Sequence, residues 1–341
     1  MQIETLNIDK PWQDHIFKKP AKKAVCVVRY GGFGDLLQTS SIFPALKKEG
    51  YHITVNTSPT GFDIIKEDPH IDAVFLQEME QVPNKELGLY WGEMEKHFDK
   101  FVQLSESIEG SLLALPGRPE YTLSKRVRHK RMNRNYFAQM HHIASVPLPP
   151  KPKFFPSFSE TVAVKEYLEQ LGAGPKIIWS LSGSSVHKAW PYTDQVIARI
   201  LLDYKDAKII FVGDQMCQLL EEQWRHENRI KRESGRMSIR NTLALSQKVD
   251  LVVGPETGVL NCVAYEKVEK ILMLSHSSKV NLGGSWVNTK VMEPKRTPCY
   301  PCHKLHYGWK TCVRDEVTGG ALCAANISPD KVYKAVRRAL R

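Results

Sequence analysis

The chain of 341 residues lacks any apolar run long enough to cross a membrane as a helix. Such a helix needs roughly 20 predominantly apolar residues, whereas pure runs such as residues 209–212 have only the length of a strand. The first twenty residues mix acidic residues with lysines and contain no apolar segment of the signal-peptide type, so we expect a cytoplasmic protein. With 42% hydrophobic and 25% charged residues, the composition excludes a disordered or collagen-like chain.

The sequence also lacks the even set of cysteines that a disulfide framework requires. Its seven cysteines are an odd number, and the cytosol keeps thiols reduced. Cys26, Cys217 and Cys262 have apolar neighbours and are expected in the core. The other four form a late cluster that begins with a C-x-x-C pair: Cys299, Cys302, Cys312 and Cys323. This spacing suits a structural zinc site, with His303 and His306 as spare ligands, and equally suits reduced cysteines that pack an irregular loop.

Acidic residues are fewer than basic ones, 37 against 48, which leaves a formal net charge of +11. Such a surplus favours an anionic partner: a nucleotide, a phosphorylated glycolipid, a membrane surface or a nucleic acid. Six of the basic residues fall between Lys125 and Arg134. This run is interpreted either as a binding surface for phosphates or as a solvated helix face.

Short apolar runs alternate with helix-length amphipathic stretches through most of the chain. Because buried strands separated by helices form parallel sheets, the pattern predicts an α/β fold with two Rossmann-like domains. Four prolines between residues 147 and 152 interrupt the alternation. We expect a first domain over residues 1–150, a linker at about 146–156, a second domain over 157–328 and a C-terminal helix over 329–341. Ligands of such sheets bind at the carboxyl ends of the strands, which predicts a cleft between the domains.

The first loop with chemical character is Arg29-Tyr-Gly-Gly-Phe-Gly-Asp35, after the first predicted strand. Its glycines, Gly31, Gly32 and Gly34, allow a tight turn and a close approach of a ligand to the backbone. The spacing is not that of the dinucleotide-binding motif, because Leu37 occupies the place of the third glycine. Asp35 lies at the start of the next helix, where it is either a catalytic carboxylate or a simple helix cap.

Two further loops follow predicted strands of the second domain. In the first loop, Gly183, Ser184 and Ser185 offer hydrogen-bond donors to a phosphate and Lys188 adds a positive charge. The alternative is a surface loop of small residues. The second loop holds four candidate ligand-binding residues: Glu256, Thr257, Gly258 and Asn261. A carboxylate in this turn can bind sugar hydroxyls while backbone amides bind phosphate, or one side chain merely caps the helix.

Taken together, these loops make the sequence similar to glycosyltransferase family 9, the ADP-heptose:lipopolysaccharide heptosyltransferases with the GT-B fold. The resemblance spans roughly residues 22–340 and rests on three elements: the GxxGD turn ending at Asp35, the Gly-Ser…Lys-x-Trp-Pro element ending at Pro191, and the Gly-x-[Asp/Glu]-Thr-Gly element ending at Gly258. A late C-x-x-C cluster also recurs among relatives. The family usually has Asp and His where this chain has Glu256 and Asn261, so the donor's sugar and base stay open.

The resemblance implies an inverting, metal-independent transfer of a heptose-like sugar from a nucleotide-diphosphate donor to a hydroxyl of a phosphorylated glycan such as lipopolysaccharide inner core. Asp35 would be the base, and Lys188, Ser184 and the turn at Thr257 would compensate the leaving diphosphate. No cofactor would be required for catalysis. Four residues of the basic run would bind acceptor phosphates, with peripheral contact to the inner face of the membrane: Arg126, Arg128, Lys130 and Arg131.

Three other functions fit the same sequence. The enzyme could glycosylate modified DNA bases, which the surplus of positive charge would suit. The chain could instead be a non-catalytic binder of nucleotide sugars or nucleic acid, with Glu256 and Asn261 marking lost activity. A GT-B epimerase, which needs no acceptor, is a weaker alternative. The oligomeric state stays open.

Overall fold

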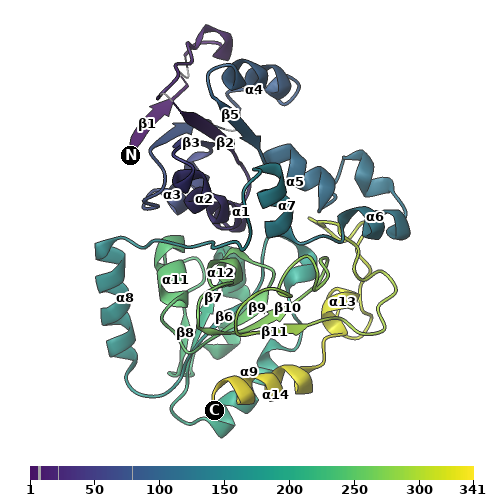
Figure 1. Ribbon diagram of the computed structural model, residues 1–341. Helices are drawn as coiled ribbons and strands as arrows, with labels where there is room; N and C mark the ends of the chain where they lie inside the picture. The colour runs from purple at the N-terminus through teal and green to yellow at the C-terminus, as the bar shows by residue number, and fades with distance from the viewer. Residues whose placement is uncertain (7–8, 22, 79) are drawn as a thin grey trace. The chain divides into compact units, whose positions relative to one another are not determined.

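The computed structural model describes residues 1–6, 9–21, 23–78 and 80–341 (Figure 1). The chain folds into two compact units, each of which has most of its residue contacts within itself. Unit 1 comprises residues 1–108 and 136–155, and unit 2 comprises residues 109–135 and 156–341. The sequence analysis placed a single boundary near residue 150. The contacts instead group the 109–135 segment, with the basic run, into unit 2, because its side chains pack against residues far along the chain.

Unit 1 is built on a parallel sheet with the strand order β1-β4-β3-β2-β5. The strands are β1 (Gln2–Thr5), β2 (Ala24–Val28), β3 (His52–Thr57), β4 (Ala73–Leu76) and β5 (Lys100–Gln103). Every residue of β2 is buried, as expected for an apolar strand covered on both faces. The exposed edge strand β1 was not predicted, because its four residues alternate too briefly to show a period.

Short helices cover the sheet of unit 1. They are η1 (Trp12–Asp14), α1 (Phe33–Thr39), η2 (Ser40–Ile42), α2 (Phe43–Lys48), α3 (Pro59–Ile65), α4 (Leu87–Glu95) and α7 (Tyr136–Ile143), and α5 (Ser105–Ser111) spans the division between the units. The apolar residues between positions 35 and 49 recur at helical spacing, which predicts one helix there. The structure divides it at η2, because Pro44 has no N–H to continue the α-helical hydrogen bonds.

Unit 2 contains a second parallel sheet, ordered β11-β10-β9-β6-β7-β8. Its strands are β6 (Lys176–Ser180), β7 (Lys208–Val212), β8 (Ile230–Arg232), β9 (Leu251–Pro255), β10 (Glu269–Met273) and β11 (Thr289–Met292). The four central strands are those predicted from apolar runs. The two edge strands, β8 and β11, were missed because they are short and carry polar residues.

The helices of unit 2 pack on both sides of this sheet. They are η3 (Pro119–Thr122), α6 (Lys125–Met132), α8 (Phe158–Leu171), η4 (Val186–Lys188), α9 (Thr193–Asp203), η5 (Gln215–Cys217), α10 (Gln218–Glu221), η6 (Glu222–Trp224), α11 (Ile239–Ser246), α12 (Gly258–Cys262), α13 (Leu322–Ala325) and α14 (Pro329–Ala339). The sequence predicts one helix over residues 215–226, but the structure has three short helical segments there, η5, α10 and η6. Trp179, Phe211 and Val253 of the strands join Val332 and Val336 of α14 in one apolar core.

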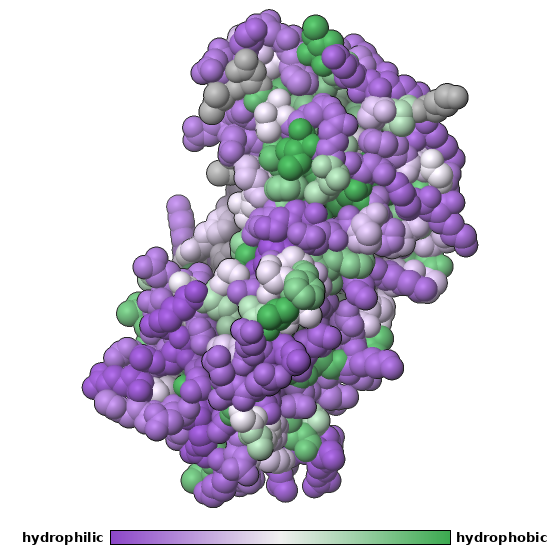
Figure 2. Space-filling model, turned by 90° about the vertical axis from the view of Figure 1, so that its left-hand side faces the viewer, coloured by the Kyte–Doolittle hydropathy of each residue, from purple (hydrophilic) through white to green (hydrophobic). Residues whose placement is uncertain are grey.

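Among the residues that the structure describes, no helix is both long enough and apolar enough to cross a membrane. In the space-filling view of Figure 2, hydrophilic residues cover most of the visible face and apolar residues form small separate groups. The two parallel sheets therefore supply the cores, and the loops after their strands supply the polar candidates for a functional site.

Candidate active site

Asp35 lies in the first turn of α1, directly after the glycine-rich loop of unit 1. Its Oδ2 accepts a hydrogen bond from the backbone N–H of Gly32 (2.8 Å), the residue that precedes the first turn of α1. Gly31 has a φ of +112°, and a Cβ there would lie 2.6 Å from the same Oδ2. The loop therefore requires glycine at this position to bring its backbone so near the carboxylate. Asp35 therefore does cap the start of α1, as one of the two predictions held. The cap uses Oδ2 and leaves Oδ1 for another partner.

That partner is Arg29, the first residue after β2. Its side chain is fully buried, and one terminal nitrogen lies 2.6 Å from Asp35 Oδ1. The other terminal nitrogen donates to the carbonyl oxygens of Leu104 (3.0 Å) and Ser105 (3.3 Å), which fixes the guanidinium in place. The Asp35 side chain nevertheless remains 34% exposed. The loop thus presents a carboxylate of fixed orientation that solvent or a substrate can reach.

The sequence analysis did not single out Arg29. A signal was present, because Arg29 is the one charged residue in the run from Ala24 to Tyr30. Arginine is almost never fully buried unless it is paired. A lone arginine at the end of a buried strand, six residues before an aspartate, could therefore have indicated an ion pair.

In unit 2, the two loops predicted to bind phosphate come together. A Cβ on Gly183 would lie 2.8 Å from Cδ of Lys188 and 3.1 Å from Cγ2 of Thr257. The Thr257 hydroxyl makes no capping hydrogen bond with α12, and it lies 3.3 Å from the Ser180 hydroxyl. One small site therefore combines a cation, a hydroxyl and a backbone segment with no side chain in the way. These are the groups that a phosphate needs.

The remaining predicted residues of these loops differ in their access to solvent. Ser184 is exposed and Gly258 is half-buried, so both can contact a ligand beside Lys188. Ser185 and Asn261 are buried. The backbone N–H of Asn261 donates to the Thr257 carbonyl (3.0 Å) as part of the first turn of α12. The structure thus brings Lys188, Thr257 and the glycine together but turns part of the predicted set toward the interior.

Glu256 is also turned inward, and both of its oxygens have partners. Oε1 accepts from the backbone N–H groups of Ser275 and Ser277, each at 3.2 Å. Oε2 accepts from the Ser275 hydroxyl (2.9 Å) and lies 2.6 Å from Nδ1 of His276. Burial by itself would raise the pKa of Glu256, but His276 first, then Lys188 and His187, lower it to about 2. The carboxylate therefore holds the loop after β10.

Histidines pack around this buried carboxylate, and sequence reasoning missed most of them. The ring of His187 lies 5.1 Å from that of His276 and 5.5 Å from that of His306, measured between centroids. Nδ1 of His187 lies 2.8 Å from the Ser275 hydroxyl. Burial, followed by the charge of His276, lowers the pKa of His187 well below its usual value. Burial, followed by the charge of Lys304, lowers the pKa of His306 to about 4, so both imidazoles are neutral at pH 7.

The late cysteines lie near these histidines. Cys302 Sγ is 3.8 Å from Nε2 of His306, and burial raises the pKa of this thiol to about 12. Burial also raises the pKa of Cys312, to about 11. Within the described ranges, no group of three or more His, Cys, Asp or Glu side chains is placed to hold a metal ion. The zinc site stays a prediction that elemental analysis of the purified protein would test.

The basic run forms α6 in unit 2, with two faces of different character. Arg126, Lys130 and Arg131 are exposed. Arg128 is buried, and its guanidinium donates to the carbonyl oxygens of Cys302 (2.8 Å) and Leu123. Three of the four predicted acceptor-binding residues can therefore meet an anion, whereas Arg128 attaches the helix to the segment that contains the cysteines.

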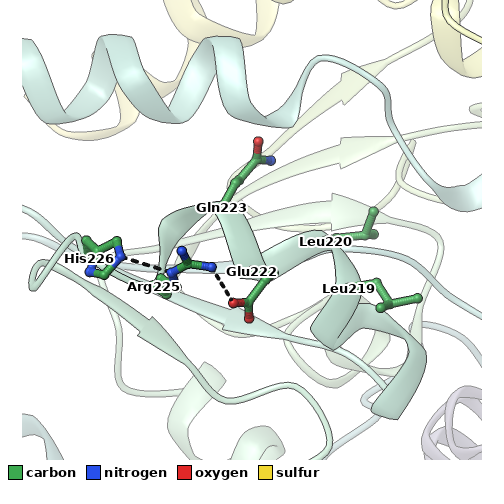
Figure 3. A pocket seen from close by; sticks show the side chains of 6 residues that line it. All are labelled: Leu219, Leu220, Glu222, Gln223, Arg225 and His226. Carbon is green, nitrogen blue, oxygen red and sulfur yellow. Dashed lines mark hydrogen bonds and ion pairs between the residues drawn. The ribbon is translucent and has the colours of Figure 1, made fainter.

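A separate open pocket of about 510 Å³ lies on the α10–η6 turn (Figure 3). It is lined by Leu219, Leu220, Glu222, Gln223, Arg225 and His226. Arg225 pairs with Glu222 (3.1 Å) and donates to Nε2 of His226 (2.9 Å). The arginine and the glutamate of this pocket are thus paired with each other. None of the predicted site residues lines the pocket.

Comparison with solved structures identifies the fold. The two units with parallel sheets form a GT-B-like α/β fold, which the chain shares with glycosyltransferases of family 9. The family 9 glycosyltransferase of Veillonella parvula has a TM-score of 0.67 and 15% identity, with 96% of this chain and 98% of that chain covered. The E. coli ADP-heptose lipopolysaccharide heptosyltransferase II has a TM-score of 0.64 and 13% identity, covering 93% and 98%.

A third similar structure is TibC of E. coli, an iron-containing dodecameric glycosyltransferase. Its TM-score is 0.59 at 13% identity, with 95% of this chain and 80% of that chain covered. No family profile matches the sequence, and no curated protein matches it significantly. The resemblance stated from the sequence motifs is therefore confirmed at the level of the fold.

Proposed function

We propose that the protein is an inverting glycosyltransferase that moves a heptose-like sugar from a nucleoside diphosphate donor to a hydroxyl of an anionic glycan. The observation that carries the proposal is the convergence of Lys188, Gly183 and Thr257 at one point of unit 2. The fold supports it, because two similar E. coli structures are a heptosyltransferase with ADP and TibC in complex with ADP-D-beta-D-heptose.

The donor's diphosphate is assigned to the site around Lys188. The ammonium group neutralises part of the phosphate charge, and the Thr257 hydroxyl donates a hydrogen bond. Gly183 lets the diphosphate approach the backbone, since a side chain there would collide with Lys188 and Thr257. Charge stabilisation at the leaving diphosphate lowers the barrier because negative charge grows there as the bond to the sugar breaks. No cofactor enters this step.

The base is assigned to Asp35 of unit 1. In a single displacement, the acceptor oxygen attacks the anomeric carbon while its proton passes to the Asp35 carboxylate. The bond between the anomeric carbon and the phosphate oxygen breaks, and the electron pair leaves with the nucleoside diphosphate. Arg29 keeps the carboxylate oriented through the 2.6 Å ion pair. Positioning of this kind is worth a large part of the rate in displacement reactions.

The acceptor is assigned to a phosphorylated glycan such as lipopolysaccharide inner core. Arg126, Lys130 and Arg131 are exposed on α6 and would contact its phosphates. Arg128 is not included, because its guanidinium is occupied by two backbone carbonyls. Glu256 and Asn261 are not assigned to the donor sugar, since both are buried.

A screen of nucleoside diphosphate sugars by thermal shift, followed by a nucleotide-release assay, tests the proposal. A ligand at 100 times its Kd stabilises a protein by about 2.7 kcal/mol, so the correct donor gives a clear shift. Nucleotide release that rises on addition of phosphorylated core oligosaccharide supports the glycan acceptor. Release that rises only with duplex DNA favours the alternative acceptor, and absence of any donor shift or release overturns the proposal.

A further inference from the structure

The segment that follows β7 turns its apolar side chains outward. In η5 and α10, Met216 is 69% exposed, Leu219 is 74% exposed and Leu220 is 43% exposed. Exposed apolar residues that are scattered singly are normal on a soluble protein, whereas a contiguous group marks an interaction site. In the part of the chain that the structure describes, no other stretch of five residues holds three exposed large apolar side chains.

This exposure is fixed by buried polar contacts on the inner side of the segment. Glu221 is fully buried, and its Oε1 accepts from the backbone N–H of Ser234 (3.0 Å) while its Oε2 lies 3.0 Å from a terminal nitrogen of Arg236. Nε2 of Gln218 donates to the Ser234 carbonyl oxygen (2.9 Å). The α10 turn therefore buries a carboxylate and exposes its leucines, the reverse of a helix that packs on a core. Turning the leucines inward would break these contacts.

The outward leucines border the open pocket of about 510 Å³ on the α10–η6 turn. In Figure 3, Leu219 and Leu220 lie at one end of the lining, Arg225 and His226 lie at the other end, and Glu222 lies between them. The Glu222 and Arg225 side chains are both more than half exposed. We name the composite the α10 surface; it comprises Met216, Leu219, Leu220, Glu222, Gln223, Arg225 and His226.

The local charge balance indicates which partners this surface suits. The chain as a whole has a formal net charge of +11, but the segment that contains the α10 surface has none. Its four acidic and four basic residues, within positions 214–232, are Asp214, Glu221, Glu222, Glu227, Arg225, Arg229, Lys231 and Arg232. Glu222 already pairs with Arg225 and Arg232, each at 3.1 Å. A nucleic acid or another polyanion therefore gains no net attraction here.

A second copy of the chain matches this surface in charge and in shape. Two chains of charge +11 repel each other, and the repulsion is weakest where the local charge is zero. In a twofold pair, the same surface serves both subunits. The protruding leucines of each copy then meet those of the other beside the two open pockets, and water leaves the apolar side chains. The rim is self-complementary, because it exposes both a carboxylate, Glu222, and a guanidinium, Arg225.

We propose that the α10 surface is the contact through which two copies of this chain form a homodimer. The proposal goes beyond the proposed function and does not depend on it, since the surface contains no residue assigned to the donor, the base or the acceptor. A standard interface buries about 800 Å² on each partner. Three apolar side chains and a short polar rim supply less than that, so we expect a weak dimer with a micromolar Kd.

Sedimentation velocity of the full chain from about 1 µM to about 300 µM tests the proposal. The average mass should rise from one chain toward two, and association should strengthen at high salt, because salt screens the repulsion between the positive chains. Leu219→Glu should raise the dimer Kd by roughly tenfold or more, since it places a charge in the apolar contact. The matched control is Leu89→Glu, at a similarly exposed leucine of α4 in unit 1, and it should leave the Kd unchanged. Thermal unfolding of both variants checks that they fold.

Covalent trapping tests the same contact without weakening it. In the presence of oxidised glutathione, Leu219→Cys should form a disulfide-linked dimer, because the twofold pair brings the two introduced thiols together. The wild type measures the background from the chain's own cysteines, and Leu89→Cys should not exceed that background. A monomer at every concentration, an equal loss of association in Leu89→Glu, or no covalent dimer above background from Leu219→Cys would each overturn the proposal.

Discussion

Asp35 and Glu256 both lie between a strand and a helix, one in each unit, but Asp35 is accessible to solvent and Glu256 is buried. Each acid follows a central buried strand and stands at or near the start of a helix. The Asp35 side chain is 34% exposed and is held by one arginine and one backbone amide. Glu256 is only 5% exposed and is surrounded by two serine amides, a hydroxyl and an imidazole. A carboxylate whose oxygens are all occupied in the interior supports structure, whereas one that remains accessible can perform chemistry.

The neighbours of each acid explain this contrast. Arg29 approaches Asp35 from the interior and leaves its outer side free. The loop after β10 folds over Glu256: two of its backbone amides donate to Oε1, and the Ser275 hydroxyl donates to Oε2. The contrast therefore predicts that changes at Asp35 affect turnover and changes at Glu256 affect stability.

The largest expected effect comes from Asp35→Asn. The amide keeps the size of the side chain but cannot accept the acceptor's proton, so kcat should fall by ~10²–10⁴-fold. Donor binding should persist, because the proposed donor site lies in unit 2. Nucleotide release and donor thermal shift measure the two quantities. Near-normal turnover would show that Asp35 is only a helix cap and would remove the contrast with Glu256.

Arg29→Lys tests whether the ion pair with Asp35 orients the carboxylate. The substitution keeps the positive charge but loses the fork that also bonds the carbonyls of Leu104 and Ser105, so the Asp35 carboxylate loses its fixed orientation. We expect kcat to fall by about 10²-fold with a smaller change in KM. Steady-state kinetics and thermal unfolding are measured together. A variant that loses stability while keeping kcat would mean that Arg29 only supports the fold.

Lys188→Ala tests the donor side of unit 2. Charge-assisted contacts are worth about 1.5–3 kcal/mol, so the donor Kd should rise by roughly 10- to 150-fold. Titration calorimetry with the nucleotide sugar measures this change, and Lys205→Ala serves as an exposed control in the same unit. If the donor Kd is the same in both variants, Lys188 is not a phosphate ligand.

Glu256→Gln should act on stability rather than on donor affinity. The amide cannot satisfy all the donors that now point at the carboxylate, so the free energy of unfolding should fall by about 1–3 kcal/mol. Chemical denaturation measures the loss. A variant with wild-type stability and a donor Kd raised more than tenfold would place Glu256 in the binding site and reverse the comparison.

The smallest effect is a difference in pH dependence. The folded-state pKa of Glu256 is about 2, below its ordinary value of 4.5, so the folded state binds this proton less readily than the unfolded state. Its contribution to stability is complete above pH 4.5 and is lost as the pH falls toward 2. Wild-type protein should therefore lose stability more steeply in this window than Glu256→Gln. Parallel slopes in acid unfolding would contradict the low pKa.

Asp35 and Glu256 also show which features of the site could be predicted from the sequence and which could not. The strand-turn-helix pattern located Asp35 and the requirement for glycine at Gly31, because both follow from local backbone geometry. It listed Glu256 among ligand-binding residues, since nothing near it in sequence reveals the loop that covers it. Ser275 and Ser277 stand about twenty residues away and reach Glu256 only through the neighbouring strand.

The sequence by itself determined the apolar strands of the two parallel sheets, their alternation with helices along the chain, and the turns that hold Asp35, Lys188 and Thr257. Apolar periodicity and glycine positions are local properties, and they act within a few residues. Only the tertiary structure decided which side chains are buried and which segments join. It sealed Glu256 under a loop and brought residues 118–134 against 295–314. The first outcome depends on contacts between residues about twenty positions apart, and the second on contacts between residues more than a hundred positions apart, so no local pattern encodes either.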